Sequence, residues 1–100
     1  MQVEFDWSPF KATANFDKHG VSFDEAMTVF ADPLALTIYD EATAGIEERW
    51  IMLGMSRRSR LVLVVHTHTQ LSPTRAKVRI ISARRPTKAE VQHYESERNG

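Results

Sequence analysis

The spacing of apolar and polar residues predicts an alternation of strands and helices along the chain. Apolar residues occupy every second position over Val3–Trp7, a pattern typical of a strand with one buried face. Ser8 and Pro9 then predict a helix start, because Ser caps exposed amides and Pro needs no amide partner in the first turn. This helix runs to about His19, and Gly20 supplies its left-handed end. Its expected apolar face is small and consists of Phe10, Ala14, Thr13 and Phe16.

The next helix has the clearest periodicity in the sequence. Ser22 and Glu25 have the spacing of a capping box, in which each side chain accepts a hydrogen bond from the other residue's backbone amide. Apolar residues follow at i, i+3, i+4 and i+7, so one face of this helix should lie in the core. They are Phe23, Ala26, Met27 and Phe30. Asp32-Pro33 ends the helix, because the residue before a proline disfavours helical conformation.

Four further strands are predicted in the middle of the chain. They span about Leu34–Tyr39, Glu48–Ser56, Arg60–His68 and Lys77–Arg84, separated by turns or loops at Asp40–Gly45, Arg57–Ser59 and Gln70–Thr74. The run Leu61–Val65 is apolar at every position, which indicates a central strand covered on both faces. The two N-terminal helices can cover one face. The C-terminal helix or a partner should help to cover the other.

The segment Val78–Glu90 connects the last strand to the last helix. Pro86 stops the strand because proline has no amide for the sheet, and Thr87 and Glu90 again have the spacing of a capping box. The helix should run over about residues 87–98, with Val91, Tyr94 and Ala89 as its apolar stripe. The resulting order is β-α-α-β-β-β-β-α. It predicts a single α+β domain over residues 1–100, with helices packed on a twisted, mainly antiparallel sheet.

The charges are distributed unevenly, although they sum to zero. No Asp or Glu occurs between Arg49 and Lys88, whereas this segment holds ten of the thirteen Lys and Arg residues. A basic half of this kind suggests a polyanionic partner such as nucleic acid. The alternative is that sheet edges and turns carry solvated cations that prevent edge-to-edge pairing.

Composition excludes several classes of protein. The chain has no cysteine, and therefore no disulfide framework and no thiolate zinc site. Its longest apolar run is five residues, too short to cross a bilayer, and its acidic N-terminus does not resemble a signal peptide. We therefore expect a cytoplasmic protein that does not act on a membrane. The sequence contains no Gly-rich phosphate loop and no Ser-His-Asp arrangement, and we expect no cofactor.

Several short motifs carry a resemblance to a known family. They are Phe5–Ala12, Asn15, Lys18–Phe23, Ala26, Phe30, Glu48–Trp50, Gly54, Leu61–Val65, Arg79–Arg84, Glu90 and Tyr94. In this order and spacing they resemble the BrnT family of type II toxin–antitoxin toxins. The resemblance implies a RelE-like ribonuclease fold and cleavage of mRNA that halts translation. It also implies a small BrnA-like antitoxin with a ribbon–helix–helix part, which would form a hetero-oligomer with the toxin, bind operator DNA and repress the operon.

Two arginines are the first candidates for a catalytic role. Metal-free RNA cleavage uses the 2′-hydroxyl as nucleophile, and it needs fixed cations where charge develops on the phosphate. Arg79 and Arg84 suit this role because a strand would hold them rigidly. They are an odd number of positions apart, so a regular strand directs them to opposite faces unless a twist or bulge intervenes. The alternative for Arg79 is a structural ion pair with Glu47, Glu48 or Glu4.

The group that transfers protons is left open among four residues: His66, His19, His93 and Tyr94. His66 ends the central strand and is expected near Arg79 if the two strands pair. His19 precedes the helix-ending glycine, where a cation also favours the helix dipole. Tyr94 either anchors the last helix or stacks on a base. His66 and His68 share one face, but without a carboxylate cluster a metal site is weakly supported, and none is expected.

The remaining cations are candidates for binding the RNA backbone. They are Lys18, Arg49, Arg57, Arg58, Arg60, Lys77, Arg85 and Lys88. Two other functions remain open alongside the endoribonuclease. One is a non-catalytic RNA-binding module that uses the same basic face. The other is a structural partner whose basic groove receives an acidic segment of the antitoxin.

Overall fold

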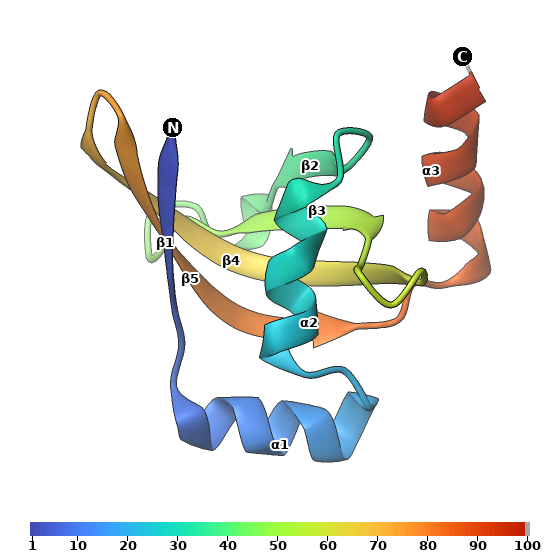
Figure 1. The fold of residues 1–100 in the computed structure, drawn as a ribbon, viewed down its shortest axis with the longest axis horizontal. Coiled ribbons are helices and arrows are strands. Elements are labelled where there is room, and N and C mark those ends of the chain that lie inside the picture. Colours follow the sequence, from blue (N-terminus) through green and yellow to red (C-terminus); the bar gives the residue numbers. More distant parts are fainter. Residues whose placement is uncertain (100) are drawn as a thin grey trace.

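A computed structural model of the protein describes residues 1–99, and the side chains of residues 1–97. The strands are β1 (Gln2–Asp6), β2 (Leu36–Tyr39), β3 (Trp50–Met55), β4 (Leu61–Ser72) and β5 (Arg75–Arg84). The helices are α1 (Pro9–His19), α2 (Phe23–Thr28) and α3 (Lys88–Asn99), with short 3-10 turns η1 (Val29–Ala31) and η2 (Glu41–Thr43). The predicted α+β class is confirmed (Figure 1).

All five strands form one sheet in the order β1-β5-β4-β3-β2. Strands β2 to β5 pair as an antiparallel meander, whereas β1 lies parallel to β5. The sheet is therefore mixed, not purely antiparallel. β1 and β2 lie at opposite edges of the sheet because α1 and α2 follow β1 and carry the chain across to β2. Most of the predicted Gln70–Thr74 loop is instead strand, because Gln70 and Ser72 pair with Ala76 and Arg75.

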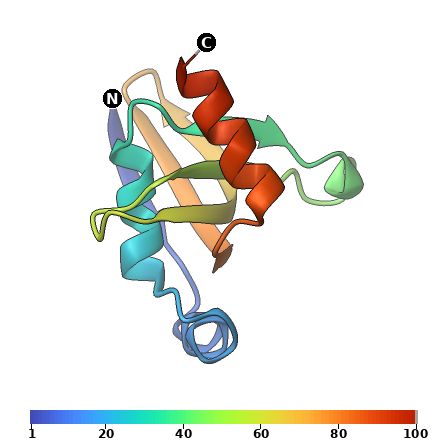
Figure 2. The same ribbon diagram turned by 90° about the vertical axis from the view of Figure 1, so that its right-hand side faces the viewer.

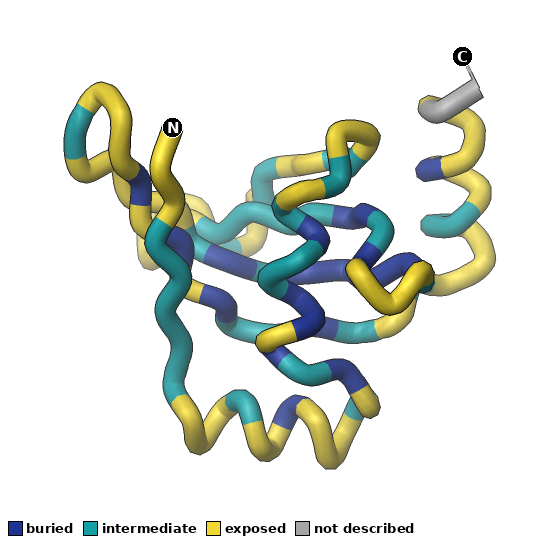
Figure 3. The backbone as a smooth tube through the Cα atoms, in the orientation of Figure 1, coloured by how far each residue is buried: buried dark blue, intermediate teal, exposed yellow. Residues whose placement is uncertain are grey.

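The sheet has two differently covered faces, here called the α2 face and the α3 face. On the α2 face, Phe23, Ala26 and Val29 pack with Val64 and Ile80 in the main core. On the α3 face, Leu53, Leu61 and Leu63 form a smaller core with Tyr94. Figure 2 shows α3 and α2 as separate layers beside the strands, and Figure 3 shows that the buried backbone follows the sheet and α2. The predicted central strand is confirmed, since Leu61 to Val64 of β4 are buried.

The predicted apolar face of α1 is wrong. Phe10 is 83% exposed and Phe16 is 52% exposed, whereas Asn15 is only 8% exposed. The buried side of α1 is polar because it has to satisfy backbone groups of neighbouring segments. The Asn15 amide donates to the carbonyls of Val21 and Ala83 (3.1 and 2.9 Å), and its oxygen accepts from the Ala83 amide (3.1 Å). Asn15 therefore fixes the end of β5 immediately before Arg84.

The two predicted capping boxes differ. At α3 both hydrogen bonds form, from the Thr87 amide to Glu90 (2.8 Å) and from the Glu90 amide to Thr87 (3.2 Å). At α2 only the Ser22 hydroxyl caps the helix, accepting from the Glu25 amide at 3.0 Å. The Glu25 carboxylate instead accepts from Arg60 and Ser56, since a buried carboxylate needs charged or hydroxyl donors. No helix in the described residues is long and apolar enough to span a membrane.

Candidate functional site

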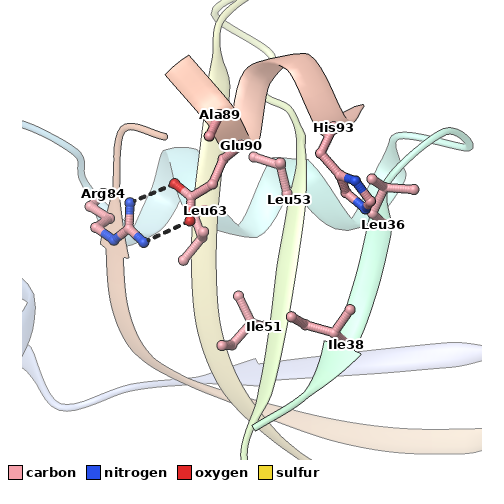
Figure 4. Close-up of a pocket in the computed structure, with 9 residues that line it drawn as sticks. All are labelled: Leu36, Ile38, Ile51, Leu53, Leu63, Arg84, Ala89, Glu90 and His93. Carbon is pink, nitrogen blue, oxygen red and sulfur yellow. Dashed lines mark hydrogen bonds and ion pairs between the residues drawn. The ribbon is translucent and has the colours of Figure 1, made fainter. Parts of the chain in front are cut away.

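A groove of about 300 Å³ lies on the α3 face, between the sheet and α3 (Figure 4). We call it the α3 groove. Its floor is apolar and comes from three strands: Leu36, Ile38, Ile51, Leu53 and Leu63. The register explains this alignment, because Leu36 pairs with Leu53, Leu53 with Leu63, and Leu63 with Arg84. Cross-strand partners point to the same side of a sheet. A row of side chains thus crosses four strands and ends at Arg84.

The wall of the α3 groove carries its polar groups. Ala89, Glu90 and His93 face the groove from α3. The Arg84 guanidinium donates to both carboxylate oxygens of Glu90, at 2.9 and 3.0 Å (Figure 4). The hydrogen bonds from Arg84 lower the pKa of Glu90 to about 2, and the same pair raises the pKa of Arg84. Both groups are therefore charged across the physiological range.

Tyr94 anchors α3 to the rest of the domain. Its side chain is 2% exposed, and its hydroxyl donates to the Asp32 carboxylate at 2.7 Å. The same carboxylate oxygen accepts the Met55 amide at 2.8 Å, which ties α3 to the end of β3. Of the two roles expected for Tyr94, the geometry favours the anchor, because a ring buried in this way has no free face for a base.

Arg79 lies on the same face as Arg84 but in the middle of β5. A bulge at Ile81 shifts the alternation, since Ile80 pairs with His66 while Ser82 pairs with Val65. On β4, Thr67 is opposite Arg79 and Leu63 is opposite Arg84. These positions are four residues apart, so the backbones of the two arginines are separated by roughly 13 Å, at about 3.3 Å per residue.

The partner of Arg79 also differs from the three acidic residues expected. Its guanidinium donates to Asp6 at 2.6 Å, because β1 lies beside β5. The expected pairing with Glu47, Glu48 or Glu4 is therefore wrong. In the structure the Arg79 guanidinium is thus paired with Asp6 and the Arg84 guanidinium with Glu90, so the two cations have different partners.

The expectation that His66 lies close to Arg79 is also wrong. His66 pairs with Ile80 and is buried on the α2 face, 3% exposed, with its ring 4.8 Å from that of Phe30. Burial lowers the pKa of His66 to about 4, so its imidazole is neutral at physiological pH.

His68 and His19 do not line the α3 groove. His68 is exposed on the α2 face beside Gln70, and His19 ends α1, which packs against the core of the α2 face. The described residues contain no cluster of three or more His, Asp or Glu that could hold a metal ion.

Several predicted RNA-binding cations gather at the end of the sheet where β5 finishes. Arg57 and Arg58 lie in the β3–β4 turn, and Arg85 and Lys88 flank the start of α3; all four are exposed. The Arg85 guanidinium donates to the Leu61 carbonyl at 2.9 Å, which joins this segment to the start of β4. We call these four residues the basic end.

The other predicted cations are held differently. Arg60 is paired with Glu25 at 2.6 Å, Arg49 with Glu47 at 3.1 Å, and Lys77 with Asp6 at 3.8 Å. Arg58 of the basic end also lies 3.9 Å from Glu25. Lys18 is exposed on α1. The structure thus brings Arg84 together with the basic end, and places Arg79, Lys77, Arg49 and Lys18 elsewhere.

Two residues of the α3 groove were not linked to Arg84 from the sequence. Glu90 was identified only as a helix cap, and His93 was one of four open choices for proton transfer. Their spacing of three residues on a predicted helix places them on one face, and this signal could have linked them. Their proximity to Arg84 depends on the turn at Pro86, which sequence spacing alone does not define.

The comparisons with known proteins identify the family. A comparison with curated protein sequences gave no match. A family model described as the ribonuclease toxin, BrnT, of type II toxin–antitoxin systems matches residues 7–90, a range that includes Arg84 and Glu90. A toxin of this class acts on RNA and has an antitoxin partner. The chain therefore belongs to the BrnT family of ribonuclease toxins.

Proposed function

We propose that this protein is an endoribonuclease that cleaves mRNA in the α3 groove and so inhibits translation. The observation that carries this proposal is the position of Arg84, at the end of an apolar groove and beside the basic end. Exposed cations suit the phosphate backbone, and the groove can receive one nucleotide drawn out of the strand. Cleavage proceeds without metal, by attack of the 2′-hydroxyl on the adjacent phosphorus.

Arg84 is the cation that stabilises charge on the scissile phosphate. Three of its hydrogen bonds go to protein acceptors in the described residues, two to Glu90 and one to the Arg85 carbonyl. A guanidinium has five N–H groups, so two remain for phosphate oxygens while Glu90 holds the plane in place. The assignment of Arg79 as a second catalytic cation stays a prediction.

The partner we propose is a BrnA-like antitoxin with a ribbon–helix–helix DNA-binding part. The hetero-oligomer would repress its own operon, with all DNA contacts made by the antitoxin. We also propose that the fold is RelE-like, since an open sheet face carrying arginine and flanked by helices suits RNA. Cytoplasmic location follows from these partners.

A non-catalytic binding module is the second candidate function. The observation in its favour is that Glu90 already balances the charge of Arg84. Such a module would bind RNA or the antitoxin through the basic end without cleaving it.

The test is incubation of the purified chain with a defined mRNA in excess EDTA. We expect fragments with 2′,3′-cyclic phosphate ends, and a loss of rate of about 10²–10³-fold in Arg84→Ala, because that is typical of removing one such donor. Arg79→Ala, on the same strand and face, tests in the same assay the prediction that Arg79 is a second catalytic cation. Equal cleavage by wild type and Arg84→Ala would contradict the assigned site. RNA binding without cleavage, with or without added metal or ribosomes, would support the binding module.

A further inference from the structure

His93 is the histidine that the structure places in the α3 groove with Arg84. It follows Glu90 by three residues, so their Cβ atoms are neighbours on one helix face, about 5–6 Å apart. Glu90 in turn holds the Arg84 guanidinium. Arg84 and His93 therefore line the same groove, with Glu90 between them. Figure 4 shows His93 on the same side of the groove as Glu90, above Leu36.

The other ionisable groups of the groove cannot donate a proton near neutral pH. Arg84 holds the pKa of Glu90 at about 2, so Glu90 remains a carboxylate. The pKa of Arg84 is raised, so the guanidinium does not release a proton. The floor is apolar, and the next acidic residues of α3 beyond His93, Glu95 and Glu97, do not line the groove. Histidine side chains, in contrast, ordinarily exchange protons in this pH range.

The size and polarity of the groove suit one nucleotide. A volume of about 300 Å³ is at the lower end of sites for small ligands, too small for a folded RNA element. The five floor residues offer an apolar surface for a base, and Ile38 among them is 60% exposed. No hydrogen bond to the His93 ring occurs within the described side chains, so the imidazole is available to a substrate.

We propose that His93 is the general acid of RNA cleavage in the α3 groove. The 2′-oxygen forms a bond to phosphorus, and the bond from phosphorus to the 5′-oxygen breaks. His93 gives its proton to that leaving oxygen, and the proton of the 2′-hydroxyl passes to solvent water. The products are a 2′,3′-cyclic phosphate and a 5′-hydroxyl, and solvent returns a proton to His93. This role rests on the proposed function, and it adds the residue and the step.

The test compares two RNA substrates with wild type and His93→Gln. One has the natural 5′-oxygen at the cleavage site, and the other has a 5′-bridging sulfur, a leaving group that needs no proton. We expect His93→Gln to lose about 10²–10⁴-fold in rate on the oxygen substrate, the usual contribution of a general acid. On the sulfur substrate it should cleave within about threefold of wild type. His68→Gln, an exposed histidine on the α2 face, is the control and should match wild type on both.

Three outcomes would overturn the proposal. Cleavage of the oxygen substrate by His93→Gln at the wild-type rate would remove His93 from the chemistry. If the same variant also bound antitoxin more weakly, the groove would be a protein-docking site. An equal loss on both substrates, in a folded variant that binds RNA, would leave no role in proton donation. If wild type cleaves neither substrate, the proposed ribonuclease function itself fails, and this result differs from the other two.

Discussion

Replacement of Glu90 by Gln separates the charge of this side chain from its role as a helix cap. Gln keeps the length of Glu, and its oxygen can still accept the Thr87 amide. It cannot form the charged, two-point pair with Arg84, whose distances are 2.9 and 3.0 Å. The variant therefore tests whether the Arg84–Glu90 pair stabilises the attachment of α3 to the sheet.

The size of the effect follows from the pKa of Glu90. A decrease from 4.5 to about 2 corresponds to at most roughly 3 kcal/mol, at about 1.36 kcal/mol per pKa unit. The Arg84 and Glu90 side chains are 39% and 30% exposed, so solvent screens the pair and reduces this value. We expect Glu90→Gln to lower the free energy of unfolding by about 1–2 kcal/mol at pH 7, between a surface pair and a buried one.

The lowered pKa of Glu90 also fixes how the stabilising effect of this residue changes with pH. A carboxyl group whose pKa is lower in the folded state stabilises the fold above its unfolded pKa, and loses this contribution as the pH falls through the folded value. Urea denaturation should therefore show the largest gap between wild type and Glu90→Gln at pH 7. The gap should narrow below about pH 4.5 and close near pH 2. Glu95→Gln, an exposed residue of the same helix, is the control. Equal stability of the two variants at pH 7, or a gap independent of pH, would refute the reasoning.

Two other substitutions test the supports of the site. Asn15→Leu should lower the free energy of unfolding by about 3 kcal/mol or more, because it leaves the buried backbone groups of Ala83 and Val21 without partners; urea denaturation measures this, and a loss below about 1 kcal/mol would contradict it. Tyr94→Phe should cost about 1–2 kcal/mol through the lost hydrogen bond to Asp32, and RNA cleavage per folded molecule should stay at the wild-type rate. A hundredfold loss of cleavage in folded Tyr94→Phe would instead make Tyr94 part of the chemistry.

The sequence predicts the elements well where local pattern and burial agree. The stripe of Phe23 and Ala26 lies in the core as expected, and the apolar run at Leu61 forms the central strand. It fails at α1, where Phe10 and Phe16 are exposed and Asn15 is buried. Apolar periodicity cannot find a helix face that is buried in order to satisfy backbone groups. It also cannot place β1 beside β5, because that pairing joins segments more than seventy residues apart.

The site was only partly predictable for a related reason. Arg84 lies at the end of β5 as expected, but its neighbours depend on the β5 bulge and on the direction of α3 after Pro86. The bulge brings Arg79 and Arg84 to one face, yet their distance along the strand keeps them in separate environments. His66 is buried on the α2 face and does not line the α3 groove, and burial lowers its pKa to about 4.

The attachment of α3 links the stability of the helix to the chemistry of the groove. The helix is held at Glu90 by Arg84 and, one turn later, at Tyr94 by Asp32. His93 lies between these two anchors, and its position over the floor depends on both. Truncation of the whole buried Tyr94 side chain, unlike loss of its hydroxyl alone in Tyr94→Phe, should therefore alter the distance between the guanidinium and the imidazole without touching either group. On this reasoning, substitutions on the buried side of α3 should affect RNA cleavage more than RNA binding, since Arg57, Arg58 and Arg85 of the basic end lie outside α3.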